Sequence, residues 1–143
     1  LVASIDREFD YDDLCTALWA LERDIPFIGT DPDVVIPAPE RDVPGSGAVI
    51  NAIAGVAERE PDAVLGKPSD TAIEMVRERL PYPAEECLVV GDRLDTDVAL
   101  GERAGMTTVL VRSGVTDDDD LAASAIDPDH VIDHLGEIDR VVG

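Results

Sequence analysis

The sequence predicts an α/β fold in which the strands pair largely in parallel. Short apolar segments alternate with amphipathic segments along the 143 residues, an order typical of strands connected by helices. Residues 87–90 are apolar throughout, as strands are when both faces of a parallel sheet are covered. Because 45% of the residues are hydrophobic and lie in periodic segments, the disorder expected of a very acidic chain is excluded.

In the first half we expect strands at residues 1–5 and 25–29 and helices at 12–22 and 45–58. The first helix has apolar residues at helical spacing: Leu14, Cys15, Leu18, Trp19 and Leu21. In the second helix, Ser46 is the expected N-cap, and one face carries Val49, Ile50, Ile53 and Val56. Four prolines lie in the intervening segment 30–44, which predicts a long irregular loop of the kind that is often functional.

In the second half we expect strands at 63–65, 87–90, 107–111 and 131–132. Helices are expected at 71–80 with Ser69 as N-cap, at 96–104, and after Asp133. The acidic run 117–120 is expected to begin a further helix, where the helix dipole favours negative charge. The two cysteines, Cys15 and Cys87, are expected to be small buried side chains, and the two histidines, His130 and His134, to be solvated or capping residues.

The composition limits the partners of the protein. A formal net charge of −21 repels nucleic acids and anionic membrane surfaces, so we exclude both. The acidic residues are spread along the chain, aromatic residues make up 3%, and lysine is almost absent. This pattern indicates a halophilic, acidic protein of a salt-rich cytoplasm. No apolar run reaches membrane-spanning length and no basic leader precedes one, which also favours a cytoplasmic protein.

The single lysine of the chain, Lys67, lies in the loop Gly66-Lys67-Pro68-Ser69, whereas ten arginines are present. Lysine carries a compact point charge on a thin stem, and arginine carries a broad planar fork. A retained lysine in such a loop is therefore suited to reach a phosphoryl oxygen in a crowded pocket. The alternative is that one lysine survived by chance on a solvated loop.

The most specific segment follows the strand 87–90 and reads Gly91-Asp92-Arg93-Leu94-Asp95-Thr96-Asp97. Functional residues of open α/β sheets gather at the carboxyl ends of strands. Asp92 and Asp97 fall in one turn at such an end, and their carboxylates suit Mg²⁺, which bridges to substrate phosphate. The alternative is that both carboxylates only cap the next helix.

Together these segments resemble the third and fourth motifs of the haloacid dehalogenase (HAD) superfamily, and most closely its NagD-like, 4-nitrophenylphosphatase-type branch. Three further segments resemble that branch: residues 2–14, Phe27-Ile28-Gly29-Thr30-Asp31-Pro32-Asp33 and Pro44-Gly45-Ser46-Gly47. The resemblance implies a Rossmann-like core, of which residues 61–143 would be the C-terminal half. Residues 1–60 would be part of an α/β cap domain.

The resemblance also implies roles for individual residues. Lys67 would stabilise the phosphoryl group and the attacking carboxylate, Asp92 would ligate Mg²⁺, and Asp97 would support that site. Substrate selection would fall to the cap loop residues Thr30, Asp31 and Asp33, together with Gly66 and Lys67. The branch usually has asparagine at the position of Asp31, so this chain carries an additional carboxyl group there.

The nucleophile of the family lies in a DxDG motif, and the sequence contains none. The segment Asp31-Pro32-Asp33 has the DxD spacing, but valine follows it in place of glycine, so we assign it to substrate selection. We therefore expect the C-terminal portion of an Mg²⁺-dependent phosphomonoesterase for a small phosphorylated metabolite or 4-nitrophenyl phosphate.

Such a chain would need the N-terminal half for activity, from the same or a second polypeptide, or would form a homo-oligomer. The alternatives are a non-catalytic α/β binding or interaction module and, more remotely, a dehalogenase of the same superfamily.

Overall fold

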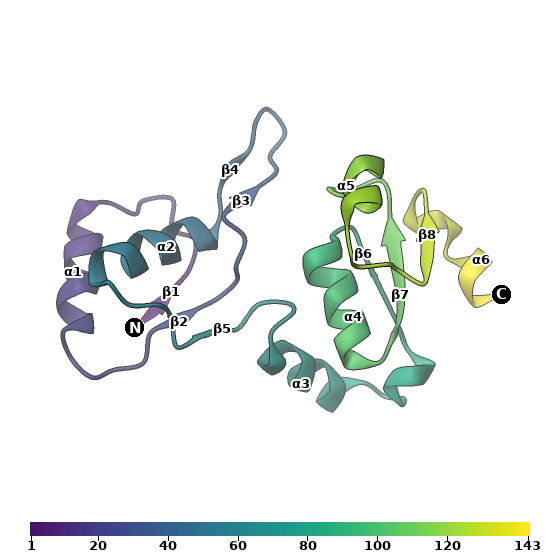
Figure 1. The fold of residues 1–143 in the computed structure, drawn as a ribbon, viewed down its shortest axis with the longest axis horizontal. Helices are drawn as coiled ribbons and strands as arrows, with labels where there is room; N and C mark the ends of the chain where they lie inside the picture. Colours follow the sequence, from purple (N-terminus) through teal and green to yellow (C-terminus); the bar gives the residue numbers. More distant parts are fainter. The chain divides into compact units, whose positions relative to one another are not determined.

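The computed structural model describes all residues, 1–143, and divides into two compact units, Leu1–Gly66 and Lys67–Gly143 (Figure 1). We expected a boundary near residue 60. The division lies further along the chain because strand β5 (Ala63–Val64) pairs with β2 (Ile28–Gly29). None of the helices has the length and apolar character needed to cross a membrane.

The first unit contains a three-stranded parallel sheet in the order β1-β2-β5, where β1 is Val2–Ala3. Helices α1 (Tyr11–Leu21) and α2 (Ser46–Ala57) pack against each other. Their apolar residues and those of the sheet form one core of Ala3, Ala17, Phe27, Ile50 and Ile53. Trp19, which has helical spacing in the sequence, is 63% exposed, so it lies outside this core.

Two local expectations in this unit are wrong. Gly45 is the N-cap of α2, and Ser46 Oγ instead accepts a hydrogen bond from the backbone N–H of Ile5 (3.1 Å). The segment expected to be irregular contains an antiparallel pair, β3 (Val35–Ile36) and β4 (Val43–Pro44). A two-stranded ribbon has two open edges, so a proline without an N–H is tolerated in it.

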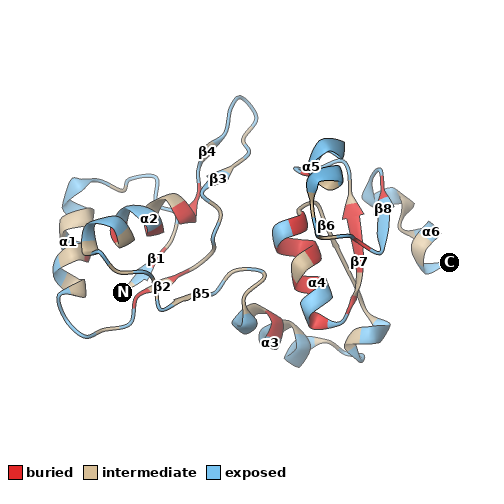
Figure 2. Ribbon diagram, viewed as in Figure 1, coloured by how far each residue is buried: buried red, intermediate tan, exposed pale blue.

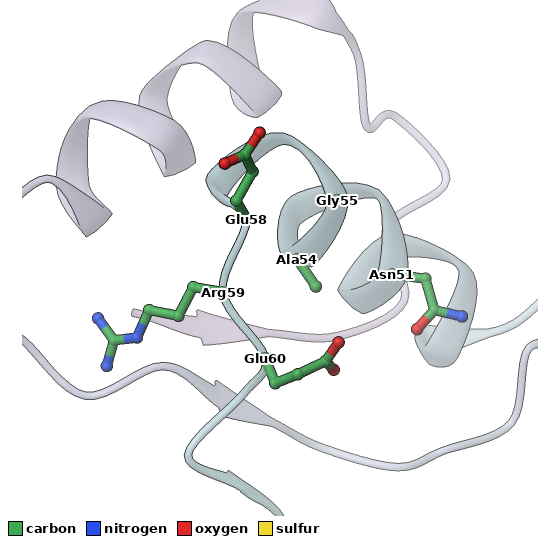
Figure 3. A pocket seen from close by; sticks show the side chains of 6 residues that line it. All are labelled: Asn51, Ala54, Gly55, Glu58, Arg59 and Glu60. Carbon is green, nitrogen blue, oxygen red and sulfur yellow. The ribbon is translucent and has the colours of Figure 1, made fainter.

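Replacing Gly55 by alanine is expected to stabilise the first unit. Gly55 lies in α2, and a Cβ added there meets no atom within 4 Å; Figure 3 shows it beside a shallow surface pocket at the end of the helix. Alanine loses less backbone entropy in a helix, so the free energy of unfolding should rise by about 0.5–1 kcal/mol. Urea denaturation followed by circular dichroism measures it, and an unchanged or lower value would contradict the prediction.

The second unit begins with α3 (Asp70–Arg79) and contains a parallel sheet in the order β6 (Leu88–Gly91), β7 (Thr107–Val111), β8 (His130–Ile132). Between β6 and β7 lie a π-helical turn, Leu94–Val98, and α4 (Ala99–Ala104). After β7 come α5 (Asp118–Ala123) and, after β8, α6 (Asp139–Val142). Short 3-10 turns lie at Ala84–Glu86 and Leu135–Glu137.

Several sequence expectations for this unit are confirmed. β7 has the expected bounds, Ser69 Oγ accepts the N–H of Ala72 (3.1 Å) at the start of α3, and the acidic run 117–120 lies at the start of α5. Figure 2 shows β7 and much of α4 as buried.

Strand β6 differs from its expectation. It is half-buried along its length, because it lies at the edge of the sheet with β7 as its one partner strand. Cys15 and Cys87 are also only half-buried.

Replacing Asp129 by alanine is expected to destabilise the second unit. Asp129 Oδ2 accepts hydrogen bonds from the backbone N–H and the hydroxyl of Thr108, both at 2.8 Å, and Thr108 is fully buried. Without the carboxylate these buried donors lose their acceptor, so the free energy of unfolding should fall by about 1–3 kcal/mol. Asp129→Asn keeps one acceptor oxygen and should cost less, whereas an alanine variant as stable as the parent would contradict the prediction.

The same hydrogen bonds make this contribution depend on pH. The hydrogen bond from the Thr108 backbone N–H, and to a smaller extent the one from its hydroxyl, holds the pKa of Asp129 below its ordinary value. The contribution is therefore complete above the unfolded-state pKa, about 4, and is lost as the pH falls through the lowered folded-state value.

Candidate functional site

Lys67 lies in the loop before α3 and forms an ion pair with the π-helical turn. Its Nζ donates to Oδ1 of Asp97 at 2.5 Å. The lysine side chain is 55% exposed and that of Asp97 is 10% exposed. The ammonium group is therefore held at its tip by a nearly buried carboxylate, while it remains accessible to a ligand.

Asp97 connects this lysine to the end of β6. Its Oδ2 accepts the backbone N–H groups of Asp92 (3.2 Å) and Arg93 (3.3 Å). The carboxylate thus folds the strand end back onto the turn, which a simple helix cap would not do. Gly91 is required here, because a Cβ on it would lie 2.5 Å from Oδ2 of Asp97 and closer still to Cβ and Cγ.

Asp92 follows β6 directly and is held by the loop after β7. Its Oδ2 accepts the N–H of Val115 (3.0 Å) and its carbonyl accepts the N–H of Thr116 (3.1 Å). A Cβ on Gly114 would overlap the Asp92 carboxylate. Residues 114–116 were not predicted as part of the site. The available signal was their place after a strand adjacent to β6, at the same carboxyl edge of the sheet.

Of the two aspartates expected at this site, Asp92 is the one available to a cation. The chain has no group of three or more histidine, cysteine, aspartate or glutamate side chains arranged to hold a metal ion. Both oxygens of Asp97 are taken by Lys67 and by backbone N–H groups. Asp92 fits Mg²⁺, which commonly uses one or two carboxylates and takes its other ligands from water and substrate phosphate.

The expected substrate residues of the first unit lie together in one loop. Thr30 Oγ1 lies within hydrogen-bond distance of Ser4 Oγ (2.8 Å) and of Oδ2 of Asp31 (3.3 Å), and Oδ1 of Asp31 accepts the N–H of Asp33 (3.2 Å). A Cβ on Gly66 would lie 2.7 Å from Cα of Asp31. The Asp31 carboxylate therefore braces its own loop, and the structure brings Thr30, Asp31, Asp33 and Gly66 into one group within this unit.

Comparisons with known proteins show which family the chain resembles. Residues 64–138 match the family described as HAD-hydrolase-like. The 4-nitrophenylphosphatase of Thermotoga maritima superposes with a TM-score of 0.91 at 36% identity, over 99% of this chain and 54% of that one. NagD of Escherichia coli K-12 superposes with a TM-score of 0.81 at 31% identity, over 96% and 53%.

Among curated proteins, the dihydroxyacetone phosphatase of Corynebacterium glutamicum (strain R) is 33% identical over 132 residues, which are 92% of this chain and 48% of that protein. The chain thus spans about half the length of the curated relatives it matches. The resemblance to NagD-like and 4-nitrophenylphosphatase-type proteins is confirmed. The chain belongs to the HAD-hydrolase-like family.

Proposed function

We propose that the chain supplies the phosphate-binding and metal-binding part of an Mg²⁺-dependent phosphomonoesterase. The observation that carries this proposal is that the Asp97 carboxylate binds both the Lys67 ammonium group and the backbone N–H of Asp92, which follows β6. Phosphoryl transfer requires mainly positioning and the neutralisation of developing negative charge. The ammonium group of Lys67 and a cation held by Asp92 would supply much of that neutralisation.

Each residue has a distinct task in this proposal. Lys67 binds and neutralises a phosphoryl oxygen, and Asp97 aims the ammonium group. Asp92 would hold Mg²⁺, which when bound neutralises phosphate charge and orients the ester. The attacking carboxylate comes from a DxDG segment outside the 143 residues, as in the family this chain belongs to.

The substrate is proposed to be a small phosphate monoester. The matched relatives include a dihydroxyacetone phosphatase, an acid sugar phosphatase and 4-nitrophenylphosphatases. We assign recognition of the rest of the substrate to Thr30, Asp31, Asp33 and Gly66. In this assignment the first unit is part of a cap domain and the second is half of the catalytic core.

A second candidate is a non-catalytic module that binds Mg²⁺ or a phosphorylated ligand without turnover. The observation that favours it is that Lys67, Asp97 and Asp92 are already linked by hydrogen bonds within these 143 residues. In the catalytic proposal the unpaired edge of β6 is covered by the complementing half or by a second copy of the chain, since an open apolar edge invites pairing.

The catalytic proposal is tested with a fusion protein, defined as this chain placed behind the portion of the Thermotoga maritima 4-nitrophenylphosphatase that lies outside the match. In molar KCl the fusion protein should hydrolyse 4-nitrophenyl phosphate with Mg²⁺ and lose activity with EDTA. Asp92→Asn should raise the Mg²⁺ concentration needed for half-maximal rate by about tenfold or more, since it removes the anionic ligand. Binding of Mg²⁺ by a folded fusion protein without turnover would favour the second candidate.

We also propose that the protein works in a salt-rich cytoplasm. With a net charge of −21, self-repulsion opposes compaction until salt screens it. The thermal unfolding midpoint should therefore rise as KCl increases from about 0.1 M to about 3 M, as the Debye length falls from about 10 Å to below 3 Å. Circular dichroism measures the midpoint, and sucrose at equal osmolality controls for solvent exclusion. A midpoint that stays constant or falls in KCl would contradict this proposal.

A further inference from the structure

Arg103, in the last turn of α4, binds the loop that carries Lys67. Its Nη1 donates to the carbonyl oxygen of Pro68, and its Nη2 pairs with Oδ1 of Asp70 at 2.5 Å. These two acceptors lie one and three residues after Lys67. We propose that Arg103 is a positioning residue that holds the Lys67 loop, an inference that rests on the phosphate-binding role proposed for Lys67.

The lysine requires such support at its base. Its side chain is 55% exposed, and a lysine stem has several freely rotating bonds whose ordering costs entropy. Asp97 fixes the ammonium group at the tip. The planar fork of Arg103 reaches a backbone carbonyl and a carboxylate together, which fixes the backbone from which the lysine projects.

Helices α3 and α4 are joined by a second arginine that does not reach this loop. Arg77 donates from Nε and Nη2 to the carbonyl of Ala104 (3.2 and 3.0 Å) and from Nη2 to that of Arg103 (3.1 Å). These carbonyls belong to the end of α4, where helices have unsatisfied acceptors. Arg77 therefore ties the helices together, and its removal is a matched control for that structural role.

The pairing of Arg103 with Asp70 is expected to add little to stability. The two side chains are 46% and 87% exposed, and ion pairs of this kind contribute little to the free energy of unfolding. The main consequence of losing Arg103 should therefore be a freer Lys67. This separates a positioning role from a merely structural one.

Because Lys67 is the single lysine, its amine can be followed by trace acetylation with acetic anhydride. The α-amino group of Leu1, in the other unit, is the internal reference. In the 143-residue chain in molar KCl, Arg103→Ala should raise the acetylation rate of Lys67 relative to Leu1 by about threefold or more as the stem gains freedom. Arg77→Ala should lower the unfolding midpoint and leave that ratio unchanged.

Two further variants keep the test decisive if Arg103→Ala folds poorly. Asp70→Asn breaks the ion pair but leaves the contact with Pro68, so its effect on the ratio should be smaller. Arg103→Gln keeps one donor and should recover part of the parental ratio. An unchanged ratio in all three variants would overturn the inference, and so would an equal increase in Arg77→Ala.

The acetylation readout does not depend on turnover. If the ratio rises in Arg103→Ala but Lys67→Ala retains full hydrolysis in the fusion protein, the positioning stands and the proposed function fails. If Lys67→Ala is inactive and the ratio does not change, the function stands and the positioning fails. In an active fusion protein Arg103→Ala should lower kcat by about tenfold, because a displaced Lys67 ammonium group would stabilise the transition state less well.

Discussion

Lys67→Ala is expected to lower the rate of 4-nitrophenyl phosphate hydrolysis by the fusion protein by about 100- to 1000-fold, the range found when one preorganised charge is removed from a transition state. The Lys67 ammonium group is paired with Asp97 at 2.5 Å and remains half exposed. Its loss removes the ammonium charge and leaves a nearly buried carboxylate without its cation. Initial rates in molar KCl with Mg²⁺ measure the effect.

Two controls define what the lysine contributes. Lys67→Arg keeps the charge but replaces a point donor with a wide fork, so the rate should remain far below that of the parent. Arg140→Ala removes an equal charge from α6, where the Arg140 side chain is 74% exposed and pairs with Glu137 of the preceding turn, and should leave the rate unchanged. A Lys67→Ala protein as active as the parent would show that the lysine has no part in the reaction.

Gly91→Ala is expected to disrupt the site through a steric clash. A Cβ at this position would overlap the side chain of Asp97, with Oδ2 at 2.5 Å. Because Asp97 is buried and carries three hydrogen bonds, it cannot move without losing Lys67 or the end of β6. Overpacking of this kind costs about 1–3 kcal/mol of unfolding free energy, and misplacement of the lysine should lower the rate by about 10- to 100-fold.

The matched control for this substitution is Gly55→Ala, which adds the same methyl group where no atom lies within 4 Å. Urea denaturation should show opposite signs, a loss of stability at Gly91 and a gain at Gly55. The rate of hydrolysis should fall in Gly91→Ala and stay unchanged in Gly55→Ala. Equal stability changes in the two variants would contradict the steric role assigned to Gly91.

Local signals in the sequence predicted the elements of the fold well where one segment determines its own structure. The strand at residues 107–111 consists of β-branched residues and one leucine, and the predicted cap Ser69 binds a donor within its own turn. The failures concern partners distant in the sequence. Ser46 binds the N–H of Ile5, 41 positions away, and half-burial of β6 follows from its place in the sheet. Such contacts cannot be inferred from periodicity.

The candidate site shows the same division. Lys67, Asp92 and Asp97 belong to two compact motifs, so all three could be proposed as site residues from the sequence, and the structure links them by hydrogen bonds. The residues that hold them were missed, because the loop at Gly114 and the guanidinium of Arg103 come from other elements. A single sequence does not show which side chain will reach a backbone carbonyl 35 positions away.

The most direct test of the account compares the chain alone with the fusion protein in one assay of 4-nitrophenyl phosphate hydrolysis, in molar KCl with Mg²⁺. We predict that the folded chain alone gives no turnover, that the Thermotoga maritima portion alone gives none, and that the fusion protein is active. Turnover by the chain alone that is abolished by Asp31→Asn would contradict it, because the nucleophile would then lie within these 143 residues. A folded fusion protein without turnover would also contradict it.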